Sequence, residues 1–319
     1  MATALLFERD SVDELQDWSK LPRLGRSTLL WIDLDQPDEP EVRRLVDVLD
    51  LSEESQASLL DPSNRPGLRD HDSYLQVTAC APTGDRGQKQ VGVTSLVSQH
   101  WVVTAHNGPL EVLETFRERA SASGDVGQLD GPEFLANLLE WVLESYFDAF
   151  EGIELVLEDI DASSMAGNHG GKDEVLTKLV TVRREIGGLR RSLTAHREVI
   201  LSLTRPELEA ITSSSSADRF ATLRTRLEDA VQAARDSRDS VVGSFDILIA
   251  NTGQRTNEIM KVLTLASVLI LPGTLLAGIM GMNFKLGLFA SEAYFWLTLA
   301  GMLAIAGLTV AGARMRNWI

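Results

Sequence analysis

Hydrophobic and polar positions follow two different periods along this chain of 319 residues. Short apolar or alternating runs at residues 5–8, 27–35, 74–81 and 91–106 are bounded by polar turns, and this pattern predicts β-strands. A turn near residues 99–100 divides the last run into two strands. Helical spacing covers residues 40–60. Residues 1–130 are therefore predicted to form a small α/β domain.

Helical spacing dominates the chain from residue 131 onward. Residues 134–165 and 176–204 place apolar side chains at steps of three and four, on either side of the loop "AGNHGGKD". The two apolar stripes are Leu135, Leu138, Val142, Tyr146, Ile153 and Leu157, and then Leu179, Val182, Ile186, Leu189 and Leu193. Two helices joined by such a loop predict an antiparallel helical hairpin over residues 131–216.

A third helical run follows the serine-rich stretch "TSSSS". Its apolar positions keep a heptad-like spacing as far as Leu248, and no proline occurs before Pro272. Residues 217–282 are therefore predicted to form one stalk helix, roughly 95 Å long, that continues into an apolar segment.

Two apolar segments end the chain, residues 262–282 and 293–313. Each has 21 residues and no charge. At about 1.5 Å per residue each spans roughly 30 Å, which is the thickness of the hydrocarbon layer of a bilayer. Helices buried in a soluble protein usually keep a polar face, and neither segment has one. The prediction is a transmembrane hairpin with residues 283–292 as its connecting loop.

Charge is unevenly distributed around this hairpin. The net charge is −16, yet residues 247–319 hold two acidic and five basic residues. The excess of acidic residues therefore lies in residues 1–246. An acidic domain argues against nucleic acid as a partner and suits a soluble domain or one that collects cations. The single cysteine, Cys80, excludes an intramolecular disulfide and fits a reducing compartment.

Basic residues also predict the orientation of the hairpin. Arg255 and Lys261 precede the first span, Arg314 and Arg316 follow the second, and the loop between the spans carries only Lys285 as a base. The positive-inside rule therefore predicts that residue 1 and residue 319 both lie in the cytoplasm. The predicted location is the cytoplasmic (inner) membrane, with more than one span per chain.

One face of the first span is composed of small or polar residues at many positions. It contains Asn257, Met260, Thr264, Ser267, Leu271, Thr274 and Gly278, which recur at steps of three and four. Such a face on a membrane helix forms a helix–helix contact or lines a water path in an oligomer. The spacing alone leaves both interpretations open.

The stretch "TNEIMKVLTLASVLILPGTLLAGIMGMNF", residues 256–284, resembles the signature of the CorA family of divalent-cation channels. It includes the Gly-Met-Asn motif, here Gly281, Met282 and Asn283. The rest of the chain is similar to the family more loosely. The resemblance implies a homopentamer with a funnel-shaped cytoplasmic α/β domain, a long helical stalk, two spans per protomer and both ends inside.

The resemblance also assigns a pore. Its lining residues are Asn257, Met260, Leu263, Ser267, Leu271, Thr274 and Gly278, with Leu263 in place of Thr264, and its ion-selecting end is Gly281, Met282 and Asn283. Mg²⁺ gives up its water reluctantly, so a ring of Asn283 carbonyls would accept hydrogen bonds from the water shell. Rings of Met260 and Leu263 would close the path by dewetting.

A regulatory site is implied in the same way. Family members bind Mg²⁺ between two acidic residues of neighbouring protomers, and these correspond to Asp61 and Asp246. Paired carboxylates are suitable ligands for a hard cation. The alternative for each is an ordinary solvated surface acid. Mg²⁺ is thus expected both as the transported and as the regulatory ion, with Co²⁺ and Ni²⁺ as further transported ions.

Lys285 departs from the family pattern, because many members have an acidic residue there. A ring of lysines would repel a dication, although screening moderates the effect. Lys285 is therefore the reason to keep a ZntB-like proton-coupled Zn²⁺ transporter as an alternative. Against it, Cys80 is alone and the five histidines have no zinc-ligand spacing.

A membrane-anchored scaffold or signalling protein is the alternative from another class. It would have an inert hairpin, so that Asn283→Ala would leave its function intact. An enzyme is not expected, because the sequence shows no nucleophile–base pair and no phosphate loop.

Overall fold

The computed structural model describes residues 2–8, 11–15, 24–25, 28–123, 129–165, 172–205, 214–282 and 292–315. Contacts divide the chain into two units, Met1–Phe245 and Asp246–Ile319.

A seven-stranded mixed sheet forms the centre of the first unit, in the order β2-β1-β3-β7-β6-β5-β4. Only β3 and β7 pair in parallel, and the other neighbours are antiparallel. The interior strand β3 is buried on both faces, which explains its nearly continuous apolar sequence. The strands are β1 (Ala2–Phe7), β2 (Val12–Glu14), β3 (Leu29–Asp35), β4 (Gly67–Asp70), β5 (Leu75–Thr83), β6 (Lys89–Val97) and β7 (Trp101–His106).

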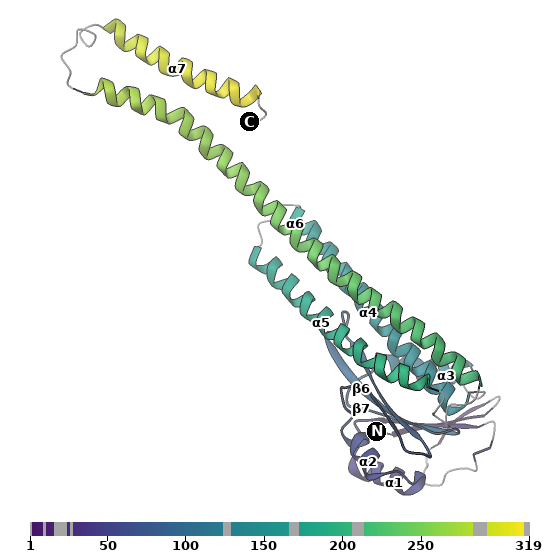
Figure 1. Ribbon diagram of the computed structural model, residues 1–319. Coiled ribbons are helices and arrows are strands. Elements are labelled where there is room, and N and C mark those ends of the chain that lie inside the picture. The colour runs from purple at the N-terminus through teal and green to yellow at the C-terminus, as the bar shows by residue number, and fades with distance from the viewer. Residues whose placement is uncertain are drawn as a thin grey trace. The chain divides into compact units, whose positions relative to one another are not determined.

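Helices cover both faces of this sheet (Figure 1). Helices α1 (Glu39–Leu49) and α2 (Glu53–Leu60) bury Val42, Leu45 and Leu59 against one face. Helices α3 (Glu111–Ser123) and α4 (Gly131–Met165) lie on the other. There Trp31 of β3 contacts Phe116 and Phe134 at ring-centroid distances of 5.5 and 5.1 Å. The first unit therefore has an α/β/α arrangement, in agreement with the predicted α/β domain.

Three elements were not predicted, and residues 40–60 form two helices rather than one. Strands β2 and β4 lie at the two edges of the sheet, where short, half-exposed strands need no apolar alternation. Helix α3 has few apolar anchors, Leu113 and Phe116 among them. Between α1 and α2, Asp50 has a left-handed φ of 53°, which ends α1, and Ser52 caps α2.

Helices α4, α5 (Lys172–Leu203) and the first part of α6 (Ser214–Met280) pack together in the first unit. All the residues of the two predicted apolar stripes are buried. Helix α6 runs parallel to α4, because Arg219 and Arg226 reach Asn137 and Glu140, respectively, at 3.0 and 2.7 Å. The heptad-like positions of α6 are also buried from Leu223 to Val241.

A buried polar network connects the sheet to α4 and α5. His196 Nδ1 lies 2.9 Å from the Ser192 carbonyl oxygen, and the Cys80 backbone N–H donates to His196 Nε2 at 3.0 Å. Tyr146 OH is 2.8 Å from the Cys80 carbonyl oxygen and 2.6 Å from Ser192 Oγ. Burial lowers the pKa of His196 to about 4 and raises that of the Cys80 thiol to about 12, so the imidazole and the thiol are both neutral near pH 7.

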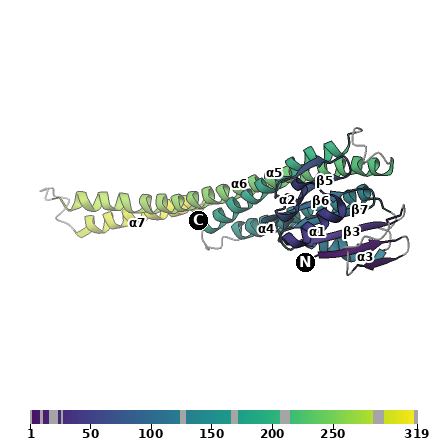
Figure 2. The same cartoon turned by 90° about the horizontal axis from the view of Figure 1, so that it is seen from below.

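The second unit consists of the last part of α6 and helix α7 (Glu292–Met315). Both views show α7 beside this part of α6 (Figures 1 and 2). Each helix contains a segment long and apolar enough to cross a membrane. Helix α6 is continuous through Pro272, which a membrane helix tolerates when neighbouring groups satisfy the freed carbonyl.

Candidate functional site

Helix α6 uses one face in the second unit to contact α7. A Cβ added to Gly273 would stand 3.0 Å from Met302 Cε, so the two helices are in contact at this point. Partly buried residues follow one stripe on α6, namely Leu265, Leu269, Pro272, Gly273 and Leu276. A matching stripe on α7 contains Thr298, Met302, Ala306, Thr309 and the buried Ala313. We call these two stripes the α6–α7 seam.

The face predicted to line a pore is not in this seam. Asn257, Met260, Leu263, Ser267, Leu271, Thr274 and Gly278 are all exposed. At about 100° per residue they are centred nearly opposite to the seam on α6. Leu263 and Thr264 are both exposed, so the geometry does not choose between them. We call this surface the polar face of α6. Contact with α7 therefore does not explain its small and polar residues.

The flanks of α6 differ from the polar face in composition. They expose large aliphatic side chains, such as Val268, Ile270 and Leu275, which suit contact with lipid. The helix thus has three kinds of surface: the seam, the apolar flanks and the polar face. A helix that only anchored a protein would need no polar face.

The hydroxyl groups of the polar face have one orientation in common. Ser267 Oγ donates to the Leu263 carbonyl oxygen at 2.9 Å, and Thr274 Oγ1 donates to that of Ile270 at 3.0 Å. Each hydroxyl proton is therefore used within the helix, and the oxygen lone pairs remain as acceptors. Acceptors without free donors suit the water shell of a cation, whose hydrogens point outward.

Gly281 and Met282 of the Gly-Met-Asn motif directly follow the C-terminal end of α6. The Gly281 N–H donates to the Ala277 carbonyl oxygen at 2.9 Å, and that of Met282 donates to the Ile279 carbonyl oxygen at 3.2 Å, so these two residues close the helix. Gly281 is not among the described residues with positive φ. The side chain of Met282 is exposed. Asn283, Lys285 and Arg316 lie outside the described residues, so their predicted roles remain predictions.

The two predicted regulatory acids lie on different elements. Asp61 follows α2 as its C-cap and is exposed, and Asp246 is exposed on α6. Neither carboxylate has a hydrogen bond or ion pair within the described ranges of the chain. Their oxygens are therefore free to bind a hard cation, and the donor type fits Mg²⁺. The described part of one chain contains no cluster of three or more acidic, histidine or cysteine side chains that could hold a metal.

A model of the family described as CorA-like Mg²⁺ transporter protein matches residues 26–311. The chain belongs to this family. The match includes every residue of the polar face and both candidate regulatory acids. The chain is accordingly a CorA-type membrane protein, and the apolar segments of α6 and α7 are its two candidate membrane spans.

Curated relatives match this CorA-family chain over nearly its whole length. The cobalt/magnesium transport protein CorA of Methanocaldococcus jannaschii is 24% identical over 299 residues, which cover 91% of this chain and 92% of that protein. The protein of the same name from Thermotoga maritima is 23% identical and covers 97% of this chain, with 90% of its own length aligned.

Solved structures share the fold. The complete CorA magnesium transporter of M. jannaschii has a TM-score of 0.83 at 22% identity, and the match covers 100% of this chain and 99% of that one. The ZntB cytoplasmic domain from Vibrio parahaemolyticus has a TM-score of 0.56 at 14% identity and covers 79% of this chain. The fold is therefore that of CorA, and the likeness to the ZntB domain is weaker.

Proposed function

We propose that the chain assembles as a homopentamer that conducts hydrated Mg²⁺ across the cytoplasmic membrane, with Co²⁺ and Ni²⁺ as further ions. The observation that carries this proposal is the polar face of α6, which lies opposite to the seam and offers acceptor oxygens. Symmetric assembly would bring one copy of this face from each protomer to a common axis. The names of the curated relatives support Mg²⁺ and Co²⁺ as cargo.

The proposed path has three parts along α6. A ring of Asn283, beyond the end of α6, would hold the ion through its water shell, and Ser267 and Thr274 would accept hydrogen bonds from that shell further in. Met260 and Leu263 would form the apolar constriction that closes the path. Both chain termini would lie in the cytoplasm, as the positive-inside rule predicts.

Regulation belongs to the same proposal. Asp61 of one protomer and Asp246 of its neighbour would bind Mg²⁺ between cytoplasmic domains when the internal concentration is high. Bound Mg²⁺ would hold neighbouring protomers together and keep the pore closed. Both carboxylates are exposed and have no partner among the described residues, which supports this assignment.

Cysteine accessibility tests the polar face directly. Cys80 is the single cysteine, and only its backbone groups join the buried network, so Cys80→Ala provides a cysteine-free background. In this background, Ser267→Cys and Thr274→Cys should react with a charged, water-soluble thiol reagent when the channel is open, and the reaction should block Mg²⁺ flux.

Leu276→Cys, in the seam, is the matched control and should not react. Equal reactivity of the three cysteines would contradict the assignment of the polar face to a water-filled path.

A further inference from the structure

The segment that carries Asp61, residues 61–65, follows α2 and packs against strand β6 of the sheet at Gly92. The Asp61 N–H donates to the Ala57 carbonyl oxygen at 3.1 Å, so the residue continues the last turn of α2. The position of its carboxylate therefore depends on what holds α2 and what holds the residues after it.

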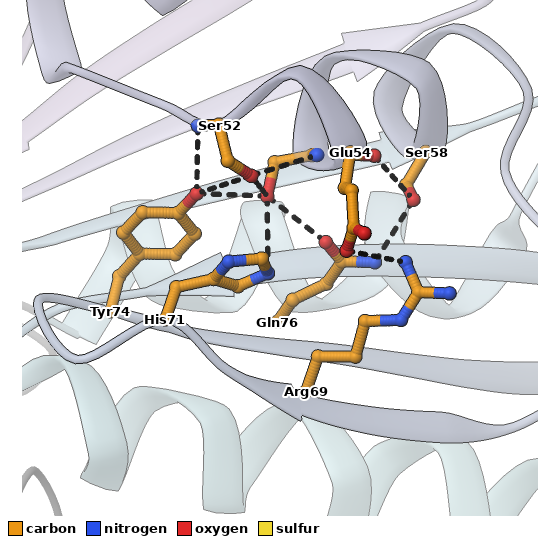
Figure 3. A network of polar contacts seen from close by, with 8 residues as sticks. Ser52, Glu54, Ser58, Arg69, His71, Tyr74 and Gln76 are labelled. Atoms are coloured by element: carbon orange, nitrogen blue, oxygen red, sulfur yellow. Dashed lines mark hydrogen bonds and ion pairs between the residues drawn. The ribbon is translucent and has the colours of Figure 1, made fainter.

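A polar network fixes α2 on the sheet before Asp61 (Figure 3). Its centre is Ser55, which is fully buried. Ser55 Oγ donates to Gln76 Oε1 at 3.1 Å and lies 2.9 Å from Tyr74 OH. One turn later, Gln76 Nε2 donates to Ser58 Oγ at 3.0 Å. Contacts to β5 thus hold two successive turns of the helix.

A second anchor follows Asp61. The Gly92 N–H on β6 donates to Asn64 Oδ1 at 2.8 Å. A Cβ on Gly92 would lie only 2.0 Å from the Ser63 carbonyl oxygen, so the backbone of this segment packs directly on the strand where no side chain stands. Asp61 is therefore placed between two anchors on one sheet.

We propose that the Asn64–Gly92 anchor, together with the Ser55 network, positions the Asp61 carboxylate for regulatory Mg²⁺. This inference rests on the proposed function. Mg²⁺ demands near-ideal octahedral geometry, so a carboxylate held in place binds it better than one on a loose segment. Asn64 and Gly92 are positioning residues in this scheme, because they act through Asp61 and touch no ion.

The test measures the Mg²⁺ concentration on the cytoplasmic side that half-closes the full-length channel in planar bilayers. Asn64→Ala removes the anchor's hydrogen bond, and Gly92→Ala pushes the Ser63 backbone away. Both should raise the half-closing concentration, by roughly five-fold for Asn64→Ala, the factor expected for one net hydrogen bond. The current in the absence of Mg²⁺ should stay unchanged, because neither residue is in the pore.

Each variant has a matched control. Ser63→Ala removes a hydroxyl whose one hydrogen bond among the described residues is accepted from the Arg65 N–H, in the same segment. Gly152→Ala creates an equal clash, 2.0 Å from the Asp85 carbonyl oxygen, at a contact of α4 that contains no residue of 61–65. Both controls should close at the wild-type Mg²⁺ concentration.

Asp61→Ala distinguishes failure of the positioning inference from failure of the proposed regulatory site. If Asp61→Ala abolishes closure while Asn64→Ala and Gly92→Ala match the wild type, the positioning inference is wrong and the regulatory site stands. If Asp61→Ala itself closes normally, the regulatory part of the proposed function is wrong. Equal shifts in the controls would also overturn the inference, since they would reflect general destabilisation. If Gly92→Ala does not assemble, the half-closing Mg²⁺ concentration of Asn64→Ala alone decides whether the anchor positions Asp61.

Discussion

Ser267 and Thr274 keep their hydroxyl protons within α6, and under the proposed function their oxygens face water. Each hydroxyl donates to the carbonyl four residues earlier and keeps its lone pairs for a partner outside the helix. Thr274→Val should therefore lower Mg²⁺ flux, roughly five-fold if one net hydrogen bond to the water shell is lost, because valine has the same shape without the oxygen. Flux into liposomes loaded with a Mg²⁺-sensitive dye measures this effect.

Thr274→Ser should conduct nearly as the wild type does, since it keeps the hydroxyl. Thr309→Val removes an equivalent hydroxyl in the seam and should also leave the flux unchanged. A similar loss in Thr309→Val would show that the effect belongs to helix packing and not to the ion path.

His196 predicts a specific dependence of stability on pH. Its Nε2 accepts the Cys80 N–H, so a proton on this nitrogen would place two donors against each other. Burial lowers the folded-state pKa to about 4, below the unfolded value near 6.5, so the unfolded chain binds more protons between these values. The free energy of unfolding should therefore fall as the pH falls through this window, by about 2 kcal/mol between pH 7 and pH 5.

His196→Gln can still accept from Cys80 but does not titrate. Thermal unfolding in detergent at pH 7 and pH 5 should show a smaller drop in midpoint for this variant than for the wild type. Identical drops in the two proteins would exclude His196 as a source of the acid sensitivity.

Periodicity alone predicted that the residues of the polar face share one side of α6, and their role in lining a pore stays a prediction. The exposed positions from Asn257 to Gly278 agree with that spacing. Periodicity did not find the Asn64–Gly92 contact, since it joins residues 28 apart in sequence, one in the segment after α2 and the other on strand β6. An isolated glycine in the predicted strand at 91–106 was the available signal, because such a glycine often marks a close backbone approach.

At the scale of elements, α4, α5 and α6 were predictable because long amphipathic helices repeat their signal many times. Strands β2 and β4 were not, because an edge strand of three or four residues carries too few buried positions. The face of α6 that contacts α7 was equally hidden, since residues 262–282 and 293–313 carry no charge and offer large apolar side chains on several sides, so that packing alone selects the seam.

The seam has a testable weak point at Gly273. Its missing side chain admits Met302, whose methyl group would stand 3.0 Å from an added Cβ. Gly273→Ala should be tolerated because the end of a methionine side chain can move, whereas Gly273→Ile should separate the helices and reduce the fraction of assembled oligomer in size-exclusion chromatography.

Met302→Ala should restore assembly in the Gly273→Ile background, because it frees the space that isoleucine needs. An additive loss in the double variant would contradict the assigned contact between α6 and α7.

At the scale of the whole molecule, the proposed regulation predicts a separation of functions. Asp246→Ala should leave conduction intact and remove closure by internal Mg²⁺, since the residue lies outside the predicted membrane spans and its carboxylate has no other described partner. Currents at rising cytoplasmic Mg²⁺ measure this. Normal closure of Asp246→Ala would remove this site from the mechanism, and lost conduction would place the residue in the ion path instead.

The central claim is that the transported ion is Mg²⁺. Lys285 is the residue in the sequence that argues most directly against this ion, because a ring of lysines would repel a dication. The deciding measurement is uptake by liposomes that contain the full-length protein, followed with Mg²⁺- and Zn²⁺-sensitive dyes with and without a proton gradient. The proposal predicts Mg²⁺ uptake that needs no proton gradient and is lost in Asn283→Ala. Zn²⁺ uptake that depends on the proton gradient, without Mg²⁺ flux, would contradict it.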